Sequence, residues 1–317
     1  MRLQNVGVLG IIAGLMLALA DRAQAQIPDF GGLIQRKVQQ GIEQKMQQKA
    51  EAQKAALVSA PAKRRALIIV NEIYAPESEL SLLPGVTADG IALQQTLIKG
   101  GFEEQNVRVL RCDATNAADR PTKQNIDLAV KDLSVKGQNG GLAMVVFVGH
   151  GTMLGGNTYL CPMDTPEKAT TDPVVAQRHL VKYDDVENAL SQSEASQKLV
   201  IIDACQTADD NLAANPIKFS QTNRDQVAVI RSCQSGTPAW HSSQWSSGES
   251  HSLFAAALNR AFEGDADLVF GNNDGRVTVY ELFHCVRVLT ERFGQDRGHT
   301  QIPEFLYSSA PFESVSY

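Results

Sequence analysis

Several patterns that would assign a function directly are missing from the sequence. The five cysteines form no Cys-x-x-Cys pair and no spacing typical of a zinc site. The body of the chain has no concentrated basic tract, and the formal net charge of −6 argues against a nucleic-acid-binding surface. No internal repeat is visible. What is present is a hydrophobic content of 43%, which is enough for a sizeable core.

Long apolar runs are also missing after the first residues. The run from Val6 to Ala20 is shorter than the roughly 20 residues that a membrane-spanning helix needs, and no later segment reaches that length. Arg2 precedes the run and Ala23-Gln24-Ala25 follows it, which is the pattern of a cleaved export signal. We therefore expect a signal peptide over residues 1–25 and a periplasmic or secreted protein. An uncleaved membrane anchor is the alternative.

The cysteine count bears on the same question of compartment. Outside the cytosol an even set of paired cysteines is usual, and five cannot all pair within one chain. At least one thiol is therefore expected to stay free. The cysteines are Cys112, Cys161, Cys205, Cys233 and Cys285.

Residues 26–62 are rich in Gln, Lys and Ala, and apolar residues recur at every fourth position from Ile34 to Met46. This spacing predicts one amphipathic helix, weakened by Gly41. A solvated tether is the simpler interpretation, and a partner-binding helix is the alternative.

From Arg64 onward, short apolar runs alternate with amphipathic segments. Runs that are apolar on both faces and alternate with helices are typical of a mostly parallel sheet covered on each side. We expect such an α/β domain over residues 63–308, followed by a tail over 309–317. The expected strands cover 64–74, 106–112, 141–151, 198–205 and 225–233, and the expected helices cover 85–101, 122–135, 181–193, 250–262 and 278–293.

Two of these strands end in side chains that can carry chemistry. One delivers His150 between two glycines, and another delivers Cys205 after Asp203 and Ala204. In open α/β sheets, functional groups collect at the carboxyl ends of the strands. If the two strands are neighbours, an imidazole and a thiol meet there, which is the usual arrangement for nucleophilic acyl transfer. Taken singly, however, a buried cysteine is more often structural and a glycine-flanked histidine more often a turn residue.

At these motifs the sequence resembles the caspase-like cysteine peptidases, and within them the bacterial and metacaspase side. The matching stretches lie between residue 64 and about residue 308, and they follow one another in the same order as in the family. Asp203-Ala204-Cys205-Gln206-Thr207 is close to the Asp-x-Cys-x-Ser-Gly of metacaspases, although Thr207-Ala208 replaces Ser-Gly. The other matching stretches are LPGVTADGIAL (83–93), TYLCPMD (158–164), ESHSLFAAAL (249–258) and DGRVTVYELFHCV (274–286).

The resemblance implies a caspase-like sandwich and a cysteine endopeptidase that needs no cofactor and cleaves peptide or protein substrates. By position, Cys205 would be the nucleophile and His150 the general acid and base. The backbone N–H groups of Gly151 and Cys205 would face the developing oxyanion.

The resemblance also implies a preference for Arg or Lys before the scissile bond, read by Asp89 and Asp203 through charge-assisted hydrogen bonds. The alternative is that Asp89 caps a helix and Asp203 satisfies backbone N–H groups. Val148 stands where the family often has serine, which removes one polar contact from the expected site. Cleavage of the chain itself after Lys218 or Arg224 is a further expectation.

Two other interpretations stay open. The domain could be a catalytically silent binding or scaffold module, as the departures at Val148 and Thr207-Ala208 allow. A redox role for Cys205 is weaker, because no second cysteine lies nearby in sequence. For residues 270–281 a turn at Asp274-Gly275 and a capping box of Thr278 and Glu281 are expected rather than a calcium loop, because Phe270 stands where the first acidic ligand is required.

Overall fold

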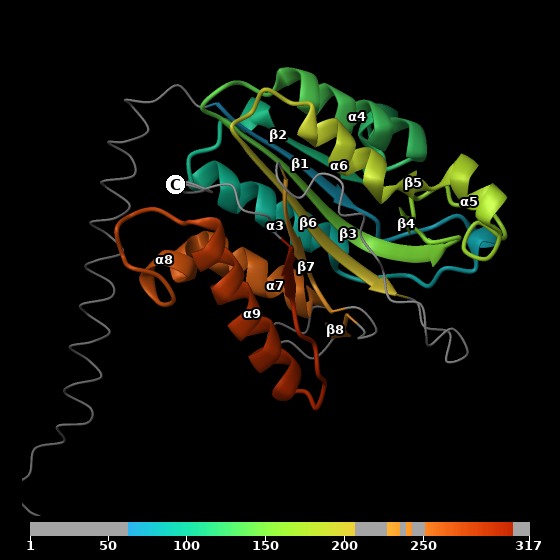
Figure 1. Ribbon diagram of the computed structural model, residues 1–317. Coiled ribbons are helices and arrows are strands. Elements are labelled where there is room, and N and C mark those ends of the chain that lie inside the picture. The colour runs from blue at the N-terminus through green and yellow to red at the C-terminus, as the bar shows by residue number, and fades with distance from the viewer. Residues whose placement is uncertain (1–62, 207–226, 235–238, 243–250, 307–317) are drawn as a thin grey trace, which may run out of the picture. The chain divides into compact units, whose positions relative to one another are not determined.

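The structure is a computed structural model, which describes residues 63–206, 227–234, 239–242 and 251–306 (Figure 1). The expected signal peptide, the tether and the tail from residue 309 lie outside the described residues, as do Lys218 and Arg224. No helix in the part of the chain that the structure describes is long and apolar enough to cross a membrane.

A mostly parallel sheet forms the centre of the domain. Its main path has the order β10-β7-β6-β3-β1-β2, in which all neighbours are parallel except β10 and β7. The end of β3 continues into an antiparallel extension with β4 and β5. The strands are β1 (Arg64–Val70), β2 (Val107–Arg111), β3 (Leu142–Leu154), β4 (Asn157–Leu160), β5 (Val181–Lys182), β6 (Gln197–Gln206), β7 (Ala228–Arg231) and β10 (Glu304–Leu306).

Helices cover both faces of this sheet (Figure 1). On one face lie α4 (Lys123–Lys136) and α6 (Tyr183–Ser191), and on the other lie α3 (Val86–Lys99), α7 (Leu253–Arg260) and α9 (Val279–Gln295). Short α5 (Pro173–His179) follows β4, and a π-helical turn, η4 (Ala261–Asp265), joins α7 to α8 (Ala266–Leu268). The α/β sandwich expected from the alternating pattern is confirmed.

The alternation of side chains along the strands divides the core into two layers. Along β3, Met144, Val146 and Val148 pack in the layer that contains α3, α7 and α9. Val145 and Phe147 pack in the layer that contains α4 and α6. Since parallel neighbours in register present the same face, this parity also decides which residues at the strand ends can meet.

Capping residues set the helix starts that the sequence predicted. The hydroxyl of Thr122 accepts the N–H of Asn125 at the start of α4. At the start of α9 the hydroxyl of Thr278 accepts the N–H of Glu281, and the Glu281 carboxylate accepts the N–H of Thr278, so the expected capping box is confirmed.

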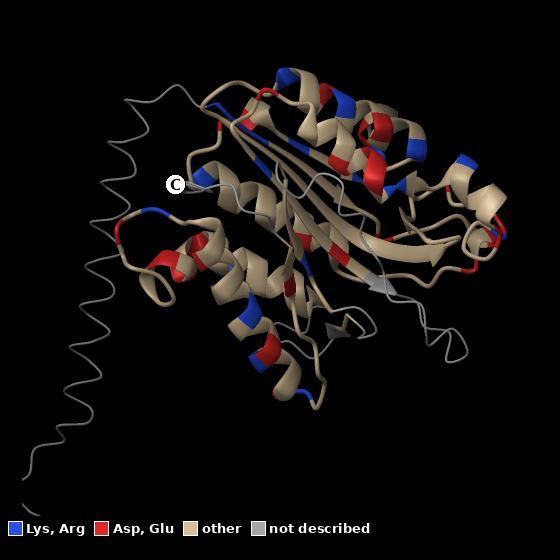
Figure 2. Ribbon diagram, in the orientation of Figure 1, with Lys and Arg blue, Asp and Glu red and all other residues tan. Residues whose placement is uncertain are grey.

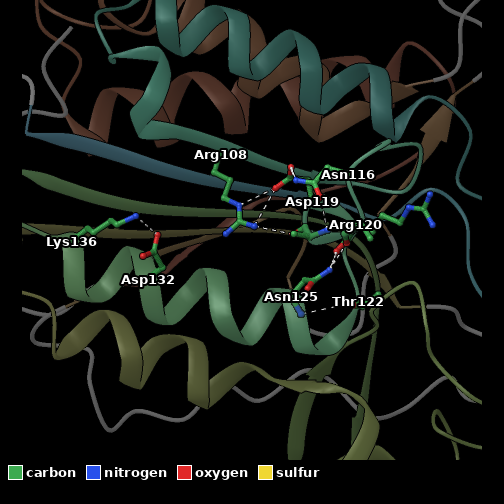
Figure 3. Close-up of polar contacts among 10 residues, drawn as sticks. Arg108, Asn116, Asp119, Arg120, Thr122, Asn125, Asp132 and Lys136 are labelled. Atoms are coloured by element: carbon green, nitrogen blue, oxygen red, sulfur yellow. Dashed lines mark hydrogen bonds and ion pairs between the residues drawn. The ribbon is translucent and has the colours of Figure 1, made fainter.

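The edge at β2 is closed to further strand pairing by charged side chains. Arg108 binds the carboxylate of Asp119 at 3.1 Å and the carbonyl oxygen of Ala118 at 2.8 Å, and Asn125 of α4 binds the carbonyls of Ala117 and Arg120 (Figure 3). Charge on an edge strand discourages association between sheets. Elsewhere, charged residues gather on helices and loops, and the central strands carry few of them (Figure 2).

Several short elements were not expected from the sequence. They include β5 and α5, and a separate two-stranded ribbon of β8 (His241–Ser242) and β9 (His251–Ser252). The helix expected over 250–262 begins only at Leu253, because Ser252 accepts the N–H of Ala255 and acts as its N-cap. Strands of two residues and a helix of only seven carry too little periodicity to be seen in a sequence.

Candidate active site

His150 lies near the carboxyl end of the parallel part of β3, before the strand continues to Leu154, and its backbone is fixed on both sides. Its N–H donates to the hydroxyl of Tyr74 at 2.7 Å, and its carbonyl oxygen accepts the N–H of Cys161 at 2.9 Å. Asn71, which follows β1, donates its side-chain amide to the carbonyl oxygen of Cys161 at 2.7 Å. The strand end is therefore rigid, and only 1% of His150 is exposed.

The imidazole ring of His150 is oriented through one nitrogen. Nε2 lies 2.8 Å from the carbonyl oxygen of Ser81 and 3.3 Å from the Ser81 hydroxyl, in the loop that precedes α3. A carbonyl oxygen can only accept, so this contact places the proton of the neutral ring on Nε2 and leaves Nδ1 as the basic nitrogen. The Tyr74 ring packs against the imidazole with 5.0 Å between centroids.

The glycines on each side of His150 are required by close approach. A Cβ atom at Gly149 would lie 2.8 Å from the hydroxyl oxygen of Tyr74, the group that binds the His150 N–H. A Cβ atom at Gly151 would lie 3.2 Å from the Cβ of Ala204 and from the carbonyl oxygen of Tyr159. A side chain at Gly149 would therefore displace the Tyr74 hydroxyl, whereas one at Gly151 would press on its neighbours by a few tenths of an ångström.

Cys205 is the register partner of His150. The two residues face each other on the adjacent parallel strands β6 and β3, whose pairing runs without interruption from Leu142 with Gln197 to Gly151 with Gln206. Neighbouring strands lie about 4.8 Å apart. The expectation that these strands are neighbours is confirmed, although β3 runs on to Leu154 while β6 ends at Gln206. The side chain of Cys205 lies outside the described part of the structure.

Asp89 and Asp203, which we call the acid pair, are brought together by the dipeptide His251–Ser252. His251 Nδ1 lies 2.6 Å from Asp89 Oδ1, and the N–H of Ser252 donates to Asp89 Oδ2 at 3.1 Å. The Ser252 hydroxyl donates to Asp203 Oδ2. The pair therefore joins α3 and β6 to the start of α7.

Both carboxyls of the acid pair are almost fully buried, with 3% of Asp89 and 2% of Asp203 exposed. Burial raises the pKa of Asp89 to about 7, although its hydrogen bonds to His251 and Ser252 act in the opposite direction. Burial likewise raises the pKa of Asp203 to about 6, against the lowering effect of Ser252 and Ser232. Carboxyl groups with a raised pKa that lie near a candidate catalytic residue, here Cys205, are typical of functional sites.

The alternative roles, a helix cap for Asp89 and a partner of backbone N–H groups for Asp203, are not seen among the described residues. Asp89 lies in the first turn of α3 but does not cap it, since the N-cap of α3 is Gly85 and its side chain bonds to β9 instead. Asp203 bonds to a serine hydroxyl rather than to backbone N–H groups. Val148, at the position where the family often has serine, pairs in register with Asp203 and packs in the core.

Four contributors were missed by sequence reasoning: Tyr74, Ser81, His251 and Ser252. Ser81 acts mainly through its backbone carbonyl, which leaves no trace in residue type. Ser252 could have been found, because a serine directly before an apolar helix is a typical N-cap. His251 had no motif of its own and becomes visible only when β9 folds against α3.

Other candidates take no part in this arrangement. In the loop before α9, Asp267 accepts the N–H groups of Asp274 and Gly275, and Glu281 accepts that of Asn272. No group of three or more potential metal ligands occurs within the described ranges. Trp240 stacks on His299 with 3.9 Å between ring centroids, away from the contacts of His150 given above.

The comparisons with known proteins agree with the fold. The family model described as Caspase domain matches residues 63–313. No curated protein gave a significant match. Together with the strand order, the mixed sheet and the two helical layers, the match over most of the chain shows that this protein belongs to the caspase family.

Proposed function

We propose that the protein is a cysteine-type endopeptidase in which Cys205 is the nucleophile and His150 the general acid and base. The observation that carries the proposal is the register of His150 and Cys205 at the ends of adjacent parallel strands. The Ser81 contact supports it, because a ring held through an Nε2 proton has Nδ1 as its basic nitrogen.

The steps follow from these positions. His150 takes the thiol proton, and the Cys205 thiolate attacks the carbonyl carbon of the substrate to form a tetrahedral oxyanion. The N–H groups of Gly151 and Cys205 are the proposed donors to that oxygen. His150 then protonates the leaving amine as the C–N bond breaks, and a water molecule, deprotonated by the same ring, releases the acid from the thioester.

The acid pair is proposed to select Arg or Lys before the scissile bond. A buried carboxylate without a cation bears the full cost of desolvation, and a guanidinium or ammonium group would offset that cost. Burial raises the pKa of both Asp89 and Asp203, which is the physical sign of that desolvation cost.

The test is hydrolysis of a peptide that ends in Arg and carries a fluorogenic leaving group, under reducing conditions. Cys205→Ala and His150→Ala are each expected to lower kcat by about 10⁴-fold or more. Cys112→Ala and His179→Ala are matched controls on half-exposed and exposed positions, and both should retain activity.

Two results together would favour a binding or scaffold module instead. The wild-type protein would hydrolyse no Arg, Lys or Asp peptide, with or without calcium, and its Cys205 would react with a chloromethylketone no faster than an ordinary thiol. An activated thiolate is alkylated much faster than a resting thiol of pKa about 8.5.

A further inference from the structure

The dipeptide His251–Ser252 already occupies three of the four oxygens of the acid pair. Asp89 Oδ1 meets the His251 ring, Asp89 Oδ2 accepts the Ser252 N–H, and Asp203 Oδ2 accepts the Ser252 hydroxyl. The two aspartates are therefore not equivalent. Asp89 is held by donors at both oxygens, whereas Asp203 is held at one.

The fourth oxygen, Asp203 Oδ1, is buried and has no hydrogen-bond partner among the described residues. The Ser232 hydroxyl also has no partner within hydrogen-bond distance, but it lies close enough to act as a weak side-chain hydrogen-bond donor that lowers the pKa of Asp203. A direct donor at full hydrogen-bond distance is therefore still lacking at Asp203 Oδ1. Buried carboxylate oxygens without a donor are costly and rare in folded proteins. A buried carboxylate oxygen of this kind indicates a place where a donor from a ligand belongs.

The contacts around Asp89 point the same way. Nδ1 of His251 lies 2.6 Å from Asp89 Oδ1, within hydrogen-bond distance. Besides the acid pair, the neighbouring elements carry Lys99 at the far end of α3, Lys198 near the start of β6, and Arg260 at the end of α7. Arg231 of the adjacent β7 forms an ion pair with Glu304. The titratable residue of β8 is His241, whose side chain lies outside the described part. Asp203 thus has fewer hydrogen-bond partners than Asp89.

We propose that His251 is a specificity-determining residue that withholds Asp89 from the substrate, so that Asp203 Oδ1 alone receives the ammonium or guanidinium group of a basic side chain. Asp89 then orients the dipeptide, and Ser252 holds Asp203 in the rotamer that presents Oδ1. This assignment rests on the proposed preference for basic residues. The sequence suggested that Asp89 and Asp203 both bind the basic side chain, whereas here Asp203 binds it and Asp89 holds His251 and Ser252 in place.

The test is binding to full-length Cys205→Ala protein, measured by calorimetry. The ligands are an acetylated peptide ending in Arg and the same peptide ending in citrulline, which has the same shape but no charge. The preference for Arg is the ratio of the Kd of the citrulline peptide to the Kd of the Arg peptide. Asp203→Asn is expected to lower this ratio by about 10-fold or more, because a hydrogen bond to a charged group is lost. Asp89→Asn is expected to lower it by about 3-fold at most, because the imidazole already engages that carboxylate.

Asp119→Asn, in the surface pair with Arg108, is the matched control for an Asp to Asn change and should leave the preference unaltered. Asp203→Ser repeats the test if the asparagine variant does not fold. Equal losses from Asp89→Asn and Asp203→Asn would overturn the inference and leave the basic preference standing. Equal affinity of the parent protein for both peptides would instead overturn the basic preference, and the inference with it.

The role of His251 is tested in the same assay at pH 9, which keeps Asp89 ionised. His251→Leu removes the donor at similar size, and His251→Asn keeps a donor near the position of Nδ1. If His251 withholds Asp89, the Asp89→Asn change matters only where the donor at position 251 has been removed. In the His251→Leu background it should lower the preference for Arg by about 10-fold, and in the His251→Asn background by about 3-fold at most. The same effect of Asp89→Asn in both backgrounds would refute the role of the imidazole.

Discussion

At the scale of single residues, the ionised Asp203 carboxylate is expected to lower the free energy of unfolding, although it binds the basic side chain of the substrate. Its pKa is raised from 3.8 to about 6, so between about pH 4 and pH 6 the folded state holds more protons than the unfolded state. The free energy of unfolding contributed by this group therefore falls as the pH rises through that window. Above it, the full penalty of the desolvated carboxylate is present.

Asp203→Asn should accordingly stabilise the protein at pH 8, by about 1 to 3 kcal/mol, and much less at pH 4. The amide keeps an oxygen for the Ser252 hydroxyl and carries no charge to desolvate. Urea denaturation at the two pH values measures the difference. A variant that is less stable than wild type at pH 8 would show that Asp203 is a structural group, contrary to the role proposed for it.

At the scale of elements, the contact between α3 and β1 positions Asp89. Gly90 follows Asp89, and a Cβ atom there would lie 2.6 Å from Cγ1 of Val70, a fully buried and stiff side chain at the end of β1. The helix therefore approaches the strand as closely as glycine allows. Any displacement of α3 moves Asp89 away from Ser252.

Gly90→Ala tests this contact. Helix propensity alone would favour alanine by about 1 kcal/mol. We expect instead a destabilisation of about 1 to 3 kcal/mol from overpacking, together with a higher KM for Arg peptides. Val70→Ala in the same chain makes room for the new methyl group and should restore part of the KM. A stabilised single variant with unchanged KM would contradict the argument.

The sequence predicted the long elements and the residues at their ends, and the reason is physical. Strands buried on both faces and helices with caps such as Thr122 are specified locally, so His150 and Cys205 could be placed at strand ends. The partners of the acid pair could not be predicted, because His251 and Asp89 are 162 residues apart and meet only through tertiary packing. The Ser81 carbonyl leaves no signal in residue type at all.

At the scale of the whole molecule, the cysteines whose side chains the structure describes form no disulfide with one another. Cys112, Cys161 and Cys285 are free thiols, as the odd count suggested for at least one. Burial raises the pKa of Cys161 and of Cys285 to about 12, so neither forms the thiolate that oxidation and disulfide exchange require. Burial also raises the pKa of the half-exposed Cys112.

Export itself is the remaining prediction at this scale. Arg2, the apolar run and Ala23-Gln24-Ala25 predict that the chain is cleaved after Ala25, since signal peptidase requires small residues at the last and third-last positions before the cut. N-terminal sequencing of the protein recovered from outside the cytoplasm should therefore begin at Gln26. Ala25→Leu, which places a bulky residue before the cut, should block cleavage, whereas Ala25→Gly should permit it. A chain that keeps Met1 at its start in wild type would instead indicate an uncleaved anchor.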